Sequence, residues 1–474
     1  MSNLERLFYP KAVGIIGANK EFFGGGYFLK CLEFSKYDKP IYLFNPRLKG
    51  ELLDGIKVYS SIMEIPEEQP IDYAIIAVRA QYCPQVLEEC GKKKVPYVCI
   101  FTSGFSEVGN YELEKEISDI ARRYNVRVIG PNCLGVHSPK GKLVMSLFPT
   151  KEEGELGIIS QSGTLSNAII GLAETTCNTY ISKLISIGNQ IDLNVVDFLK
   201  YFLTDNDTQI IGMYLENIKG QKAGSELIET VRQLSLEKQK PVIILKVGFY
   251  GESAKEAIIS HTGGMAGSPQ IWEAFAKQSG AILVQSTKEL VTLAMGFKYL
   301  DISQINRNIS VIAVGGGTTI ELTDHMEMHN LKVPKLSENT KNQLQEFLPS
   351  VNTILRNPLD LGVMGGNPEN LRRALITLDK DPNISVIVFI QPYRYDNAYT
   401  KAIIGAKSEM KKPLICVANQ MIEDTNEYRS KLRLKKEAFK VGIPIFGSID
   451  LTAKALDRMC SFKEFLERHK NNEN

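Results

Sequence analysis

Short runs of apolar residues recur along the chain, and each leads through glycine or hydroxyl residues into a stretch with helical periodicity. The first run, Lys11–Ala18, precedes Gly24–Gly26 and an amphipathic stretch from Tyr27 to Phe34. This succession of strand, glycine-rich loop and helix is typical of the first unit of a parallel sheet that binds nucleotides. Because the apolar runs are nearly continuous, we expect strands that are covered on both faces.

The same alternation continues through three segments, which predicts an α/β protein with about three domains. The runs that we expect to form further strands are 41–44, 73–78, 97–101, 126–129, 156–159, 210–215, 242–247, 310–314, 386–390, 413–417 and 443–445. In open α/β sheets, ligands bind beyond the carboxyl ends of the strands. The residues that directly follow these runs are therefore the candidates for binding.

In the first segment these candidates suit a phosphate-rich, nucleotide-like ligand. They are Gly17, Ala18, Asn19, Asn45, Arg47, Val78, Arg79, Thr102, Ser103 and Asn132. An arginine at a strand end suits a ribose phosphate better than a ribose diol, although a surface arginine after a turn explains Arg47 equally well. The glycines do not form G-x-G-x-x-G, so NAD and a dehydrogenase activity are disfavoured.

A second anion site is predicted at Ser160–Thr164, where an apolar run meets a helical stretch. Plain capping of that helix by Ser162 or Thr164 is the alternative. Glu216 follows the run 210–215, and a carboxylate at that point could orient a histidine. Asp192 and Asp197 flank the start of a helix, and we expect both to be caps.

His261 follows an apolar run and precedes a glycine-rich turn that opens onto a helix after Ser268. Such a turn directs backbone N–H groups and the helix dipole at an anion, so this histidine could contact a phosphate or carry one. A histidine that only caps the loop is the alternative. His325 and His329 are spaced for a metal ion, but a solvated helix face is the better interpretation, and we expect no metal.

Composition and charge narrow the function further. The net charge of the 474 residues is +2, so nucleic acid and acidic membrane surfaces are not expected partners. The eight cysteines form no C-x-x-C pair, which is typical of buried thiols in a reducing compartment. No run approaches the ~20 apolar residues of a membrane span, and the first residues lack a signal-peptide core. We therefore expect a cytoplasmic protein.

Five motifs occur in order along the chain. They are Gly130-Pro131-Asn132-Cys133-Leu134-Gly135, Ser160-Gln161-Ser162-Gly163, Tyr214-Leu215-Glu216, Ser260-His261-Thr262-Gly263 and Asn357-Pro358-Leu359-Asp360-Leu361. Together they resemble the α subunit of the nucleoside-diphosphate-forming acyl-CoA synthetases. The branch is acetate–CoA ligase (ADP-forming), a relative of succinyl-CoA synthetase, and the resemblance covers nearly the whole chain.

The resemblance implies a Rossmann-like CoA-binding domain (1–145) and two flavodoxin-like doubly wound domains (146–303 and 304–465). It also implies that His261 is phosphorylated and that Glu216 supports it. The groups that would hold the phosphate are Ser162, Gly163, Thr164, Gly263 and Gly264. Coenzyme A would lie along the ten candidate residues of the first segment, although Arg79 stands where the family often has proline.

The family interconverts acyl-CoA, ADP and phosphate with a carboxylic acid, ATP and CoA through an acyl phosphate. Its ATP-grasp module has no counterpart here, so the resemblance implies a separate β subunit that binds ADP or ATP with Mg, in an αβ or α2β2 assembly. The acid itself is not predicted. A regulatory subunit that binds CoA or acyl-CoA without catalysis is the alternative, and the presence of both His261 and Glu216 argues against it.

Overall fold

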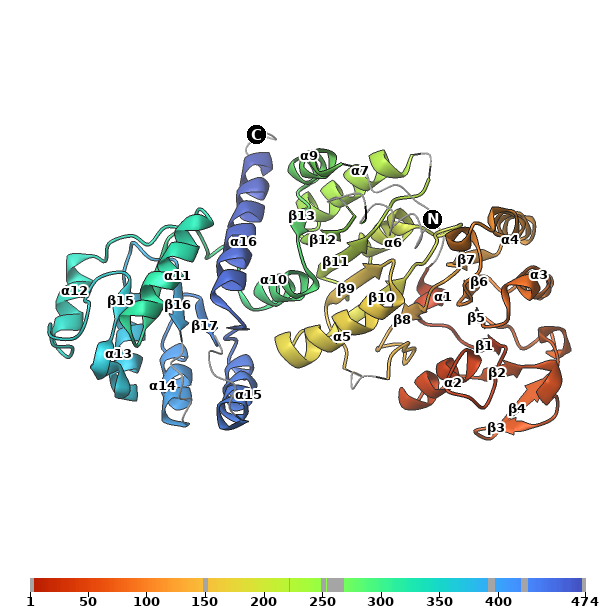
Figure 1. The fold of residues 1–474 in the computed structure, drawn as a ribbon, viewed down its shortest axis with the longest axis horizontal. Coiled ribbons are helices and arrows are strands. Elements are labelled where there is room, and N and C mark those ends of the chain that lie inside the picture. The colour runs from red at the N-terminus through yellow and green to blue at the C-terminus, as the bar shows by residue number, and fades with distance from the viewer. Residues whose placement is uncertain are drawn as a thin grey trace. The chain divides into compact units, whose positions relative to one another are not determined.

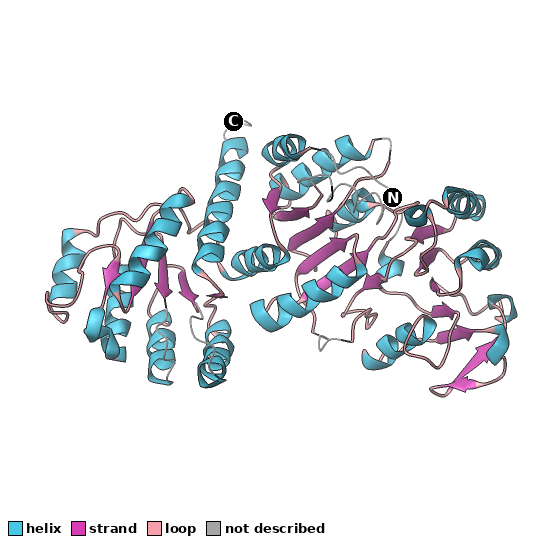
Figure 2. Cartoon of the chain, in the orientation of Figure 1, coloured by secondary structure: helices cyan, strands magenta, loops and turns pink. Residues whose placement is uncertain are grey.

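A computed structural model describes residues 4–147, 152–220, 222–248, 253, 268–390, 397–418 and 425–470. The chain divides into two compact units, Met1–Leu290 and Val291–Asn474. In each unit helices cover the faces of mainly parallel sheets (Figures 1 and 2). This architecture confirms the predicted α/β class.

The first sheet has the order β3-β4-β2-β1-β5-β6-β7 and is parallel except at β3, which pairs antiparallel with β4. The six parallel strands follow the 3-2-1-4-5-6 order of a dinucleotide-binding sheet. The strands are β1 (Val13–Ile16), β2 (Ile41–Phe44), β3 (Leu52–Leu53), β4 (Ile56–Tyr59), β5 (Tyr73–Ile76), β6 (Tyr97–Ile100) and β7 (Arg127–Ile129).

The second sheet has the order β13-β12-β11-β9-β10-β8. Its five parallel strands follow the flavodoxin-like 2-1-3-4-5 order, which places the topological switch point between β9 and β11. β8 lies within the predicted first domain but pairs antiparallel with β10 of this sheet. The strands are β8 (Gly135–His137), β9 (Leu156–Ser160), β10 (Ile181–Ser186), β11 (Ile210–Leu215), β12 (Val242–Lys246) and β13 (Ile282–Val284).

The third sheet belongs to the second unit and has the order β15-β14-β16-β17-β18, again the flavodoxin-like 2-1-3-4-5 pattern. Each strand of this sheet pairs parallel with its neighbours. The strands are β14 (Ile309–Ala313), β15 (Leu359–Asp360), β16 (Val386–Ile390), β17 (Leu414–Val417) and β18 (Ile445–Phe446).

Helices connect the strands and bury their apolar faces against the sheets. One hydrophobic core contains residues of both sheets of the first unit, for example Ile15 and Ile159, which explains why these sheets form a single compact unit. Helices α1 to α7 are Glu5–Phe8, Gly25–Phe34, Cys83–Lys92, Tyr111–Tyr124, Gly163–Cys177, Val195–Phe202 and Ala223–Leu236. Helices α9 to α16 are Pro269–Ser279, Thr287–Tyr299, Gly316–Met328, Glu338–Gln345, Pro368–Asp379, Asn397–Lys407, Thr425–Lys440 and Ile449–Lys470.

The predicted helix caps have different outcomes. Asp197 forms a capping box with Asn194 at the start of α6, which confirms the prediction for that residue. The prediction for Asp192 is wrong. Its carboxylate accepts hydrogen bonds from Nε of Arg127 at 2.9 Å and from the backbone N–H of Val128 at 2.7 Å, so it joins the β7 strand to the loop before α6.

A helix able to cross a membrane would need a long apolar run, and none of the helices within the described ranges has one.

A buried lysine on β10 of the second sheet pairs with two aspartates in the loop before β11. The Lys183 side chain on β10 is fully buried, and its Nζ lies 2.9 Å from Asp205 and 3.1 Å from Asp207. The Tyr9 hydroxyl donates to Asp207 at 3.0 Å, which ties the start of the chain to this cluster. A buried ammonium group is tolerated only when it is paired in this way.

We predict that Lys183→Met lowers the free energy of unfolding of the first unit by about 3 kcal/mol, because two carboxylates lose their buried partner. The matched control is Lys200→Met, whose bridge to Glu226 is exposed, so its removal changes stability far less. The single tryptophan, Trp272, lies in the first unit, and its fluorescence during urea denaturation reports the transition. Equal effects of the two substitutions would contradict the prediction.

Candidate functional site

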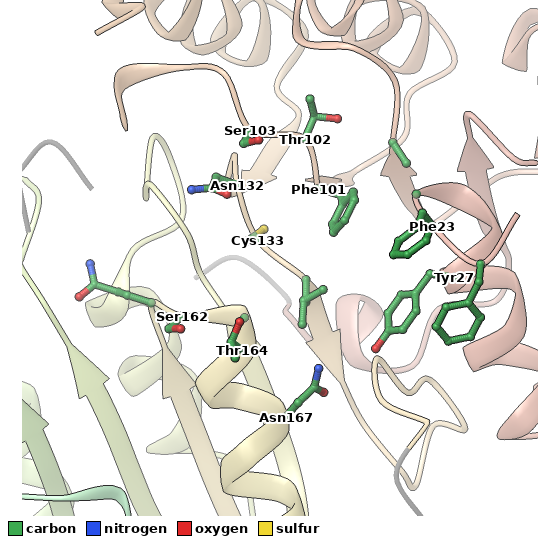
Figure 3. A pocket seen from close by; sticks show the side chains of 16 residues that line it. Phe23, Tyr27, Phe101, Thr102, Ser103, Asn132, Cys133, Ser162, Thr164 and Asn167 are labelled. Carbon is green, nitrogen blue, oxygen red and sulfur yellow. The ribbon is translucent and has the colours of Figure 1, made fainter. Parts of the chain in front are cut away.

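A cavity of about 630 Å³ lies in the first unit, where loops of the first sheet face the start of α5. Six predicted site residues line it together (Figure 3): Thr102, Ser103, Asn132, Ser162, Gly163 and Thr164. They come from the carboxyl ends of β6 and β7, from the loop between β9 and α5, and from the first turn of α5. The structure thus brings two candidate sites, one in each predicted domain, to a single cavity.

The polar wall of the cavity is the N-terminus of α5. Ser162 is the N-cap residue, and its side chain accepts a hydrogen bond from the backbone N–H of Leu165 at 3.3 Å, so the capping role predicted as an alternative is real. Thr164 is exposed at the second helical position. The first turn of a helix carries N–H groups without intrahelical acceptors, and its partial positive charge attracts anions. This wall is therefore suited to a phosphate.

The loops after β1 and β2 form one connected turn beside the cavity. Gly17 has φ of 91°, and a Cβ there would lie 2.4 Å from the carbonyl oxygen of Ala77, so only glycine fits. Asn45 Nδ2 donates to the carbonyl of Ala18 at 2.7 Å, and Asn19 Nδ2 donates to that of Phe23 at 3.1 Å. These amides hold the turn rigid.

The remaining first-segment candidates lie around this turn. The Thr102 hydroxyl donates to the carbonyl of Val78, which joins the ends of β5 and β6. Arg47 and Arg79 are exposed and do not line the cavity. Their placement leaves both guanidinium groups open to solvent, where a ligand extending out of the cavity could meet them.

Aromatic residues of the cavity were missed by the sequence analysis. Phe23, Tyr27 and Phe101 line the wall opposite α5 (Figure 3), and Phe22 also lines the cavity. Phe23 remains 76% exposed, which is unusual for a large apolar side chain. The sequence signal that could have predicted this wall is Phe22-Phe23, which directly precedes the glycines at 24–26.

Glu216 follows β11 and is buried, with 4% exposure. The Tyr214 hydroxyl donates to Oε1 of Glu216 at 3.1 Å. The pKa of Tyr214 is raised, mainly because the hydroxyl is buried and also because the Glu216 carboxylate is close. The predicted His261, Gly263 and Gly264 lie outside the described residues, so their roles stay predictions.

Lys246 ends β12, in register with Leu215, the residue before Glu216. It is buried, its Nζ donates to the carbonyl of Val247 at 2.6 Å, and the same atom lies 5.6 Å from the ring centroid of Trp272. Burial lowers the pKa of Lys246 to about 8, while the charge of Glu216 acts in the opposite direction. A titratable cation therefore lies on the strand next to the candidate carboxylate.

His325 and His329 both approach Asp450, with nitrogen–oxygen distances of 3.9 and 3.8 Å. Lys454 already lies 3.0 Å from the same carboxylate. Within the described ranges, no group of three or more His, Cys, Asp or Glu side chains is arranged to hold a metal ion.

Comparisons with known proteins add to this geometry. A family model described as a CoA binding domain matches residues 11–139, and one described as a succinyl-CoA ligase like flavodoxin domain matches residues 153–297. A solved structure of the dinucleotide forming acetyl-coenzyme A synthetase 1 of Ca. Korarchaeum cryptofilum, in complex with phosphate and ADP, aligns with a TM-score of 0.86 at 28% identity over 99% of each chain.

Two relatives have similar sequences. The acetate–CoA ligase [ADP-forming] of Methanocaldococcus jannaschii is 40% identical over 76% of this chain, which spans about half (49%) of that protein's length. The acetate–CoA ligase [ADP-forming] I subunit alpha of Pyrococcus furiosus is 33% identical over 99% of both chains. The family resemblance seen in the motifs is thereby confirmed: the chain belongs to the ADP-forming acetate–CoA ligase family.

Proposed function

We propose that the chain is the α subunit of an ADP-forming acyl-CoA synthetase and that its cavity holds the thioester end of CoA beside a phosphate. The observation that carries this proposal is the shared cavity, in which the strand ends of the CoA-binding sheet face the N-terminus of α5. A thioester and an anion that must react need to be held next to each other, and this arrangement does so.

Coenzyme A enters from the first sheet in this proposal. Its phosphates lie along the turn that contains Gly17 and Asn19, with Arg47 and Arg79 at the solvent side, and its pantetheine arm passes Thr102 and Ser103 into the cavity. The rigid turn and the exposed guanidinium groups support this direction.

Phosphate binds at Ser162–Thr164, where the helix dipole favours its charge. One phosphate oxygen attacks the thioester carbonyl, the carbon–sulfur bond breaks, and the CoA thiolate leaves as an acyl phosphate forms. A ring nitrogen of His261 then attacks phosphorus, and the carboxylate leaves with the electrons of the broken oxygen–phosphorus bond. Neutral imidazole is nucleophilic near pH 7, which suits it to this step.

Glu216 supports the histidine by accepting a hydrogen bond from its other ring nitrogen, which favours the imidazolium character of phosphohistidine. Gly263 and Gly264 supply N–H groups on the opposite side of the phosphate. Burial of Glu216 and its bond from Tyr214 support this role, because a fixed carboxylate orients imidazole better than a mobile one.

The phosphoryl group then passes to ADP on a partner. The partner is an ATP-grasp β subunit that binds the nucleotide with Mg, in an αβ or α2β2 assembly. The name of the Pyrococcus relative, a subunit alpha, supports a two-subunit enzyme. In the reverse direction the assembly makes acyl-CoA from a small carboxylic acid, ATP and CoA in the cytoplasm.

The first test uses acetyl-CoA and radiolabelled phosphate. We expect acid-labile, base-stable label on the wild-type chain with the β subunit present, and none on His261→Ala. His329→Ala, a histidine substitution in the second unit, should keep the label. Label that persists in His261→Ala, or CoA release without labelled protein, would contradict the phosphohistidine proposal.

The second test concerns the phosphate wall. We predict that Thr164→Asp raises KM for phosphate by about tenfold or more, because an added negative charge repels the anion. Stability should not fall, since an acidic residue in the first turn favours the helix. Ala168→Asp adds the same charge to an exposed position of α5 that does not line the cavity, and its KM should stay near the wild-type value. Equal KM values in the two variants would place phosphate elsewhere.

The third test uses the lowered pKa of Lys246, about 8. The unfolded chain keeps this proton up to its ordinary pKa, whereas the folded chain loses it above about 8, so this group makes the fold more stable as pH rises between those values. We predict that the melting temperature of wild type, relative to Lys246→Met, rises between pH 7 and pH 10. Circular dichroism melts measure it, and a constant difference would show that Lys246 is not a buried titrating group.

A further inference from the structure

Gln161 lies between the two loops on which the proposed phosphoryl transfer depends. It follows β9, directly before the N-cap residue Ser162, and its side chain is 2% exposed. Its Oε1 accepts hydrogen bonds from the backbone N–H groups of Glu216 and Asn217, the latter at 3.1 Å. Its Nε2 donates to Oδ1 of Asn217 at 3.2 Å. One amide therefore joins the phosphate loop to the loop that carries Glu216.

The position of these bonds is set by the sheet. β9 and β11 are adjacent and parallel, with Ser160 opposite Tyr214, so the residues after both strands emerge side by side. This is the switch point of the second sheet, where chain connections diverge and leave an open edge. The strands alone do not fix the two loops beyond that edge. Gln161 supplies the cross-link.

Gln190 contacts Asn217, one of the residues bound by Gln161, from another direction. Gln190 Nε2 lies 3.5 Å from Oδ1 of Asn217, and Gln190 Oε1 accepts the backbone N–H of Val195 at 3.3 Å. Asn217 is thus held from two directions, and the bond from Tyr214 fixes the carboxylate of Glu216. Buried amide networks with satisfied partners are rigid, because every alternative position leaves a polar group unpaired.

We propose that Gln161 is a positioning residue that holds the Glu216 carboxylate at a fixed place relative to the N-terminus of α5. This inference rests on the proposed function, in which the N-terminus of α5 binds phosphate and Glu216 supports the histidine. Gln161 would set the distance between Glu216 and that phosphate. Gln161 also lines the cavity, so occupation of the cavity by substrate contacts the same side chain that anchors the Glu216 loop.

A double-mutant cycle tests this role in the complete α and β assembly. Gln161→Met keeps the length of the side chain but removes its three hydrogen bonds. We expect kcat to fall at least about tenfold, while KM for CoA changes less than about twofold, because CoA binds on the first sheet. In a Glu216→Ala background, the same substitution should lower kcat by less than about twofold, because the group that Gln161 positions is gone.

The matched control is Gln85→Met, an exposed glutamine on α3 whose Nε2 donates to Glu89 at 3.1 Å, and it should leave kcat and KM unchanged. If Gln161→Met does not fold, Gln161→Asn replaces it, since the shorter side chain stays polar but its oxygen no longer reaches the N–H groups of Glu216 and Asn217, and the same cycle applies. Equal losses of kcat in both backgrounds, or no loss with wild-type Glu216, would overturn the role of Gln161. A wild-type assembly that forms no phosphohistidine would instead overturn the proposed function.

Discussion

The N-terminus of α5 facing the carboxyl ends of the first sheet is the arrangement on which the rest of the account depends. Parallel strands place all their carboxyl ends at one edge, so the loops that follow β6 and β7 cluster. The short, buried antiparallel β8 then carries the chain from the first sheet into the second. Because both sheets share one hydrophobic core, the cavity between them has walls of fixed geometry. The dipole of α5 can hold a phosphate in position to react with a thioester only if the opposite wall of the cavity, formed by the first sheet, stays in place.

Much of this fold could be predicted from the sequence because the signals are local. The apolar runs at 13–16 and 210–215 form strands that are buried along their whole length, and the run at 41–44 forms a strand whose last two residues are buried. The glycine-rich turn after β1 was predicted from glycine itself, whose positive φ at Gly17 no other residue would adopt without a clash. Ser162 was predicted as an anion-binding residue or a cap, and its hydrogen bond shows that it caps the helix.

The features that the sequence did not predict depend on long-range contacts. β8 and β10 are short or interrupted by polar residues such as Lys183, whose burial makes sense only with Asp205 and Asp207 beside it. Asp192 has the local setting of a cap, but a distant arginine on β7 offers a stronger bond. Gln161 lies within a motif that was noticed for its serines and glycine, and its role is visible only where β9 and β11 lie side by side.

Hydrogen–deuterium exchange of the α chain with CoA alone and with phosphate alone tests the central claim most directly, because it maps both ligands without requiring turnover. The account predicts that CoA slows exchange at the ends of β1, β5 and β6, that phosphate slows exchange in the first turn of α5, and that both ligands together protect Asn132–Leu134 between them. Protection of the α5 N-terminus by neither ligand, or protection by phosphate only in the second unit, would contradict it.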